Sequence, residues 1–189
     1  MRQLLDAAFV CRKCGNAVSP EQYKSDSFCP DCGTSLRPLR YWMFQFNPLI
    51  YQWHDWIKEN SESEQWLASQ HARKIRKGDR VAIWSSGNRS GVYAIGEIVA
   101  DPSRYPLAPE QEKYYIQKAD VNKFREKNSV MVKYLKIVAD RPLLEDKCRE
   151  DPVLSAMEIL KQSQGTNFPL TREQWIRILE LVELRTSTK

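Results

Sequence analysis

Two matched cysteine pairs constrain the fold of this 189-residue chain more than any other feature. Each pair belongs to a Cys-x-x-Cys-Gly sequence, and the four residues are Cys11, Cys14, Cys29 and Cys32. Each pair places two sulfurs on one side of a tight turn, because the glycine that follows can take the backbone angles that the turn needs. Two such turns complete a tetrahedron around zinc. We therefore predict one structural zinc ion, held by four thiolates with no coordination position left for a substrate.

Disulfides and a redox-active thiol pair are the alternatives for these cysteines. The N-terminal sequence passes from a short apolar stretch directly into cysteine and charge, without a signal-peptide cleavage pattern. No apolar run approaches the roughly 20 residues that span a bilayer. We therefore expect a cytoplasmic protein without membrane contact, and disulfides are rare in the cytoplasm. Redox motifs rarely occur as two matched pairs. Cys148, in an acidic stretch far along the chain, is expected to be a lone thiol.

The chain is expected to contain a small N-terminal unit and one larger domain. Residues 1–37 are too few to bury a core of their own, so zinc should supply much of the folding free energy of this zinc ribbon. A linker is expected at 36–40. From residue 41 onward the composition becomes that of a domain with a core, and the chain as a whole is 42% apolar and 28% charged, as in folded proteins. We assign residues 41–189 to the second domain.

Hydrophobic patterning in the second domain predicts both strands and helices. The strands, with partial period-two alternation, are expected at 41–46, 79–86, 91–99 and 128–138. A helix is expected at 51–60. Two further helices have start signals: Asp151 caps a helix at 151–162, and a capping box from Thr171 to Gln174 begins a helix at 171–183.

Positive charge is concentrated more than the total suggests. The formal net charge is +5, and four zinc-bound thiolates would lower it to about +3. Residues 71–80, however, carry five basic side chains and one acidic side chain. The residues predicted to contact nucleic-acid phosphates are Arg73, Lys74, Arg76, Lys77 and Arg89. A solvated face is the alternative interpretation of this run.

Catalytic motifs are scarce, so we expect a protein that is not an enzyme. His54 and His71 are the only histidines, and neither belongs to a metal-ligand pattern. The sequence contains no phosphate-binding glycine loop, no nucleophile elbow, and no carboxylate pair at a spacing suited to acid–base work. Trp84, by contrast, stands beside Ser85 and Ser86 at a glycine-bearing bend. An aromatic face next to hydrogen-bonding groups at a strand end is suited to a flat polar ligand.

A family resemblance rests on Trp66 and on three segments that follow one another along the chain. They are YWMFQFNP at 41–48, IRKGDRVAIWSSGNRSGVYAIGEIVADP at 75–102, and ILKQSQGTNFPLTREQWIRIL at 159–179. Together these residues resemble the EVE domain family, relatives of the YTH domains within the PUA-like fold. The resemblance implies an α+β fold, with a β-barrel of about five or six strands and flanking helices, which the small zinc ribbon would precede.

The resemblance also implies a pocket that accepts a modified base flipped out of nucleic acid. Carried over position by position, the pocket residues are Phe44, Phe46, Asn47, Trp66, Trp84, Ser85 and Ser86. Trp66 corresponds to an aromatic residue of the cage that surrounds the base. The other tryptophans are expected to be core residues, and they are Trp42, Trp53, Trp56 and Trp175.

We therefore predict a non-enzymatic reader of a modified base, with methylated or hydroxymethylated DNA favoured over RNA. The resemblance further implies a sensor of a restriction or defence system, with a nuclease or motor subunit as effector. The alternatives are a reader of methylated RNA, a zinc-ribbon interaction adaptor with a vestigial pocket, and an enzyme that acts on a small ligand. The zinc ribbon departs from the minimal domain, so it leaves the partner and the form of nucleic acid open.

Overall fold

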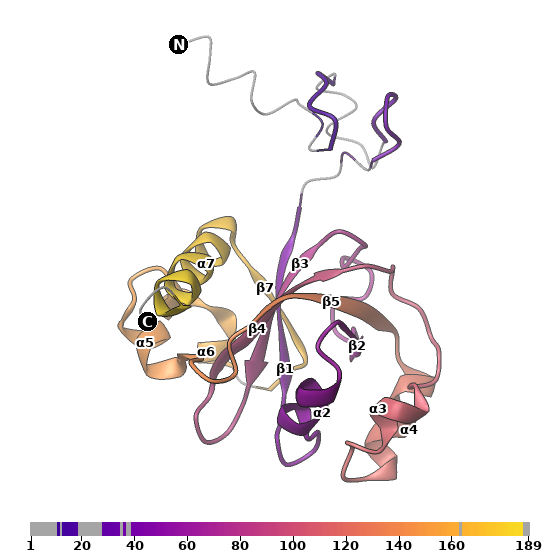
Figure 1. Cartoon of the computed structure of the whole chain (residues 1–189), viewed down its shortest axis with the longest axis vertical. Helices are drawn as coiled ribbons and strands as arrows, with labels where there is room; N and C mark the ends of the chain where they lie inside the picture. The colour runs from indigo at the N-terminus through magenta and orange to yellow at the C-terminus, as the bar shows by residue number, and fades with distance from the viewer. Residues whose placement is uncertain are drawn as a thin grey trace. The chain divides into compact units, whose positions relative to one another are not determined.

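The computed structural model describes residues 11, 13–18, 28–34, 36, 39–162 and 164–186. The chain forms two compact units, Met1–Leu39 and Arg40–Lys189. Figure 1 shows that the strands of the larger unit form one curled sheet, with the helices beside it. Within the described residues, every helix is too short or too polar to cross a membrane.

The larger unit is built on a mixed sheet. Its strands are β1 (Tyr41–Phe46), β2 (Ser63–Leu67), β3 (Arg80–Ser85), β4 (Gly91–Ile98), β5 (Ser129–Ile137), β6 (Leu143–Leu144) and β7 (Asn167–Leu170). They lie in the order β2-β5-β4-β3-β1-β7, and the short β6 pairs with β4. β1 and β3 are parallel, and the other pairs are antiparallel. The sheet curls into a half-barrel, which confirms the PUA-like α+β fold with flanking helices.

Helices cover both faces of this sheet. They are α2 (Trp53–Glu59), α3 (Pro109–Glu112), α4 (Lys118–Glu126), α5 (Glu145–Glu150), the 3-10 helix η2 (Leu154–Ala156), α6 (Glu158–Lys161) and α7 (Arg172–Thr186). In Figure 1, α5, α6 and α7 gather on one side of the sheet, and α2, α3 and α4 lie apart from them. Each face therefore has its own hydrophobic core.

Strand alternation decides which side chains enter which core. On β1, Phe44 belongs to the core beneath α2, whereas its neighbour Met43 belongs to the core beneath α7. On β3, Ile83 faces the α2 side and Trp84 faces the α7 side. This alternation follows from the period of two in an extended chain. It places Trp84 away from the aromatic cluster that surrounds Trp66.

Local signals in the sequence predicted two helix starts, at Asp151 and at Thr171. The Thr171 Oγ1 accepts a hydrogen bond from the Gln174 backbone N–H at 3.2 Å, and the Gln174 Oε1 accepts one from the Thr171 N–H at 3.0 Å, which confirms the capping box. Asp151 Oδ1 accepts from the N–H groups of Val153 and Leu154 at 3.0 and 3.1 Å, but Asp151 does not occupy the N-cap position of η2, which is Val153. The helix expected at 151–162 is wrong in its extent, because the segment forms the short η2 and α6 with a break at Met157. The sequence patterns predicted neither the strands β2, β6 and β7 nor the helices α3, α4 and α5.

Candidate functional site

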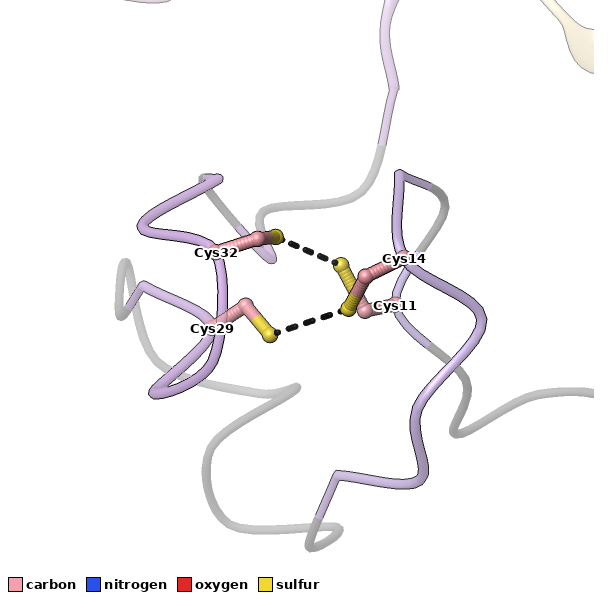
Figure 2. A group of neighbouring side chains, drawn as sticks. All are labelled: Cys11, Cys14, Cys29 and Cys32. Atoms are coloured by element: carbon pink, nitrogen blue, oxygen red, sulfur yellow. Dashed lines mark hydrogen bonds between the residues drawn. The ribbon is translucent and has the colours of Figure 1, made fainter.

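The four N-terminal cysteines come together in the smaller unit. Their sulfur atoms all lie within 4.8 Å of one another, and Figure 2 shows the four side chains pointing toward one another. The sulfurs of Cys11 and Cys32 are 3.5 Å apart, and those of Cys14 and Cys29 are 3.7 Å apart. A disulfide needs about 2.05 Å, whereas a tetrahedron with zinc–sulfur bonds of about 2.3 Å has edges of about 3.8 Å. The geometry therefore fits a bound zinc ion.

The two cysteine turns have the same backbone geometry. The Gly15 N–H donates to the Cys11 carbonyl, and the Gly33 N–H donates to the Cys29 carbonyl, both at 2.9 Å. Gly15 and Gly33 have φ angles of 77° and 66°, in the left-handed region that favours glycine. The glycine after each cysteine pair is thus what lets the turn close and bring its two sulfurs to one side.

A cavity of about 350 Å³ opens in the larger unit, within the range of about 300–1,000 Å³ that is usual for small-ligand sites. It lies at the ends of β1 and β2, against the segment that carries α4. Its lining residues are Gln45, Phe46, Asn47, Ile50, Tyr51, Trp66, Leu67, Ser69, Ser86, Tyr115, Asp120, Lys123, Lys127, Gln164, Gly165 and Thr166. The cavity combines aromatic rings with hydrogen-bonding groups and cations.

Four aromatic residues form the apolar wall of this cavity: Phe46, Tyr51, Trp66 and Tyr115. The Trp66 ring meets Phe46 and Tyr51 edge to face, at centroid distances of 6.2 and 6.4 Å. Tyr51 and Tyr115 stack at 4.4 Å with 18° between their planes. Mutually packed rings lose little freedom when a planar ligand enters, and aromatic faces are suited to stacking on a base.

A buried carboxyl group supports this wall from behind. Glu64 is 1% exposed, and its Oε2 accepts hydrogen bonds from Trp53 Nε1 at 3.1 Å and from the Tyr134 hydroxyl. The Tyr134 hydroxyl also accepts a hydrogen bond from Trp66 Nε1 at 3.3 Å. Burial raises the pKa of Glu64 to about 8, because a charged carboxylate is poorly solvated there. Trp66 is therefore held in place through Tyr134 and Glu64.

Gln111 connects the same carboxyl to a second wall residue. Its Nε2 donates to Glu64 Oε1 at 3.1 Å and to the Tyr51 hydroxyl at 3.2 Å. The same nitrogen lies 3.0 Å from the Gln65 carbonyl oxygen. Two of the four wall rings are thus connected, each through one intermediate residue, to one buried acid.

Charged and polar groups complete the cavity. On α4, Asp120 and Lys123 form an ion pair at 2.5 Å, and Lys127 follows the helix. Across the cavity, the hydroxyls of Ser69 and Thr166 are hydrogen-bonded at 2.8 Å. A ligand that fits here would meet aromatic faces, hydroxyls that can donate or accept, and cations suited to phosphate.

Sequence reasoning placed seven residues at the pocket, and the structure brings four of them to the cavity lining: Phe46, Asn47, Trp66 and Ser86. Phe44 is fully buried in the core behind it. Trp84 packs in the other core, on the opposite face of the sheet, because it is one residue out of phase with the inward-facing Ile83. Ser85 is 1% exposed and does not line the cavity. The assignment of these three residues to the pocket has no support in this geometry.

The two serine hydroxyls at the bend donate to the protein's own backbone. The Ser86 hydroxyl donates to the Phe46 carbonyl at 3.1 Å, and the Ser86 N–H donates to the same oxygen at 2.9 Å. The Ser85 hydroxyl donates to the Ser86 carbonyl at 3.5 Å. Asn47 Oδ1 accepts from the Leu49 N–H at 2.9 Å, so this side chain shapes the turn after β1. Ser86 and Asn47 can still offer their remaining polar atoms to a ligand.

The basic run 71–80 forms a turn before β3. Arg73, Lys74 and Lys77 are exposed, and Arg89 is exposed on the β3–β4 turn. Arg76 is partly buried, and its guanidinium donates to the Ile75 carbonyl at 2.7 Å. The cations at the cavity itself, Lys123 and Lys127, were not among the predicted contacts. Two adjacent tyrosines at 114–115, followed by several cations, are the sequence feature that could have indicated this side of the cavity.

Comparison with known proteins gives the family of the larger unit. The EVE domain family matches residues 40–181. Comparison with curated proteins gave no match. Among solved structures, Rpa0253 from Rhodopseudomonas palustris is 20% identical, with a TM-score of 0.56, and the match covers 77% of this chain and 94% of that one.

Two further structures have the same fold. A hypothetical protein from Leishmania major is 18% identical, with a TM-score of 0.58 and coverage of 79% of this chain and 98% of its own. Human THYN1, solved in complex with 5-methylcytosine containing DNA, is 15% identical, with a TM-score of 0.56 and coverage of 76% and 98%. The family match covers most of the sequence, and the folds agree with it. The chain belongs to the EVE domain family.

Proposed function

We propose that this protein is a non-enzymatic reader of DNA that carries a modified base, which it turns out of the strand into the cavity described above. The observation that carries the proposal is the cavity wall, in which Phe46, Tyr51, Trp66 and Tyr115 surround a space large enough for a small planar ligand. THYN1, a structural relative, was crystallised with DNA that contains 5-methylcytosine, and this supports a methylated cytosine as the first ligand to test.

The energetics of the cavity are compatible with base flipping. Removing a base from its stack costs a few kcal/mol, and stacking on an aromatic side chain recovers about 1–3 kcal/mol per base. Lys123 and Lys127 at the same cavity can contact the phosphates beside the base. The cavity thus offers aromatic stacking for the base and positive charge for the phosphates beside it, which together offset the cost of unstacking.

Paired oligonucleotides that differ by one methyl group test the proposal. We expect the wild-type protein to bind DNA with a single 5-methylcytosine more tightly than the same DNA with cytosine, in fluorescence anisotropy titrations. Tyr115→Ala, at a half-buried wall position, should lower the affinity for methylated DNA by about 1–3 kcal/mol and affect plain DNA less. Equal affinities for every modified and plain pair, including RNA pairs, would instead support an adaptor with a vestigial pocket.

Trp66 provides a second test with a matched control. Trp66→Ala and Trp84→Ala both remove a buried tryptophan, 6% and 2% exposed, but only Trp66 lines the cavity. Both variants should lose stability, since such truncations cost about 3–5 kcal/mol. Only Trp66→Ala should also lower the methylated-to-plain affinity ratio, measured at a temperature where circular dichroism shows both variants folded. A similar decrease of the methylated-to-plain affinity ratio in both variants would mean that Trp66 affects binding only through the stability of the fold.

We also propose that Cys11, Cys14, Cys29 and Cys32 bind one structural zinc ion. The sulfur–sulfur distances and the paired glycine turns support this assignment. Elemental analysis of protein purified without chelator should give one zinc per chain. Absence of zinc from such a preparation would contradict it.

A role as the sensor of a restriction or defence system, with a nuclease or motor subunit as effector, is proposed from the EVE family resemblance. Co-purification of the full chain with such a subunit would test it. The cytoplasmic location stays a prediction from the sequence.

A further inference from the structure

Exposed apolar side chains gather beside the cavity. Within the described part of the larger unit, five large hydrophobic residues are exposed: Leu49 (81%), Ile50 (37%), Ile116 (53%), Leu135 (55%) and Ile176 (39%). The first three come from two segments that are far apart in the sequence but adjacent in space, and we call them the apolar lip. Scattered exposed apolar residues need no explanation, whereas a group of them at one place marks a contact surface.

Backbone pairing brings the two segments of the lip together. Tyr51 and Tyr115 form an antiparallel bridge, and the Ile116 N–H donates to the Ile50 carbonyl at 3.0 Å. In an antiparallel pair of this register, Ile50 stands opposite Ile116. Their neighbours Tyr51 and Tyr115 line the cavity, and Ile50 lines it too. The lip is therefore continuous with the edge of the proposed base pocket.

The turn that carries Leu49 has a fixed backbone. Asn47 Oδ1 accepts from the Leu49 N–H, and the Asn47 carbonyl accepts from the N–H groups of Ile50 and Tyr51, all at 2.9 Å. Pro48 restricts the same turn. The most exposed apolar side chain of the lip thus projects from a rigid support, so it would lose little backbone entropy on insertion between other groups.

Charge around the lip favours nucleic acid as the occupant. Residues 113–127 carry five basic side chains and two acidic ones, and Lys123 and Lys127 line the cavity that the lip borders. A protein partner would be equally able to cover the apolar atoms, but nucleic acid also satisfies the excess of positive charge beside them.

We infer that the apolar lip is a wedge for double-stranded DNA, in which Leu49 and Ile116 fill the space left in the stack when the modified base enters the cavity. The inference rests on the proposed base-reading function and deepens it by assigning duplex DNA as the substrate form. Apolar side chains that insert between base steps offset the loss of stacking in this way. A single strand has no continuous stack to fill, so the lip contributes little to its binding.

The test compares duplex and single-stranded DNA with the same 5-methylcytosine. Leu49→Ala should weaken binding to the methylated duplex about tenfold and to the methylated single strand less than about twofold. Leu49→Met should restore duplex binding, because a long apolar side chain also serves as a wedge. Leu135→Ala is the matched control, since it truncates another exposed leucine, which lies on β5 and is not part of the lip, and it should leave both affinities unchanged. Thermal unfolding of each variant verifies that the fold is intact.

The outcomes separate this inference from the proposed function. Suppose that the wild type prefers methylated DNA, but Leu49→Ala weakens binding to duplex and single-stranded DNA equally, or weakens neither. The wedge is then refuted, and the proposed base-reading function is unaffected. If Leu49→Ala is selective for duplex but the wild type ignores the methyl group, the wedge stands and modified-base reading is refuted. A wild-type protein that binds no duplex refutes the wedge.

Discussion

Replacing Glu64 with glutamine should remove a pH dependence that this buried carboxyl imposes on folding. Burial raises the pKa of Glu64 from 4.5 to about 8, so the folded protein binds this proton more tightly than the unfolded chain does. The stabilisation by the bound proton is complete below about pH 4.5 and is lost as the pH rises through about 8. Each unit of pKa change is worth about 1.4 kcal/mol, so the rise in the pKa of Glu64 corresponds to a loss of about 5 kcal/mol of unfolding free energy between low and high pH.

Urea unfolding, followed by tryptophan fluorescence from about pH 5 to about pH 9, measures this effect. All six tryptophans lie in the larger unit, so the signal reports on the domain that contains Glu64. The free energy of unfolding of Glu64→Gln, minus that of the wild type, should increase by several kcal/mol across this pH range. Glu126→Gln, which changes an exposed glutamate, should show no such trend.

A difference that stays constant from pH 5 to pH 9 would refute the reasoning. It would mean that Glu64 is ionised in the folded protein over this whole pH range, because hydrogen bonds from Trp53, Tyr134 and Gln111 outweigh its desolvation. A glutamine at this position can still accept the hydrogen bonds from Trp53 and Tyr134 through its one side-chain oxygen. The Gln111 side-chain nitrogen keeps the Tyr51 hydroxyl and the Gln65 carbonyl as partners, so general unfolding of the variant at every pH is not expected.

Three further predictions concern the metal, the basic run and the sheet. Cys29→Ser should lose zinc in elemental analysis while the tryptophan-detected unfolding curve of the larger unit stays unchanged. Reversing the charges of Arg73 and Lys74 should weaken methylated and plain DNA alike and reduce the slope of log affinity against log salt by about one to two, whereas an unchanged slope would make this run a solvated face. Gly96→Ala should destabilise the domain by about 1–3 kcal/mol in urea unfolding, since its Cβ would lie 2.6 Å from Val132 Cγ1 and 2.8 Å from the Lys133 carbonyl oxygen.

Local chemistry in the sequence was enough to predict some of these features. The cysteine turns are complete within five residues each, and the capping box of α7 within four, so their geometry depends little on the rest of the chain. Trp66 and Asn47 were identified as pocket residues through the family resemblance, and both line the cavity. Their role in binding stays a prediction.

The remaining site residues could not be predicted because distant segments meet there. Tyr51 was assigned to a helix, whereas in the structure it pairs with Tyr115, which is far away in the sequence, and lines the cavity. Glu64 resembles any surface glutamate in the sequence, because it stands in the polar stretch NSESEQ at 60–65. Trp84 lies outside the cavity lining for a different reason, because the alternation along its own strand places it in the core on the far face of the sheet.

Selectivity for a modified base requires a more rigid pocket than affinity alone does. One buried methyl group contributes about 0.8 kcal/mol, enough for only about a fourfold preference. A larger preference requires a wall that cannot relax around the smaller, unmodified base, because a flexible cavity would close and recover the lost contacts. Here Trp66 is fixed through Tyr134 and Glu64, and Tyr51 through Gln111 and its stack with Tyr115. Burial of a carboxyl group behind the aromatic wall lowers stability as the pH rises, but the hydrogen bonds it accepts hold the wall in one shape.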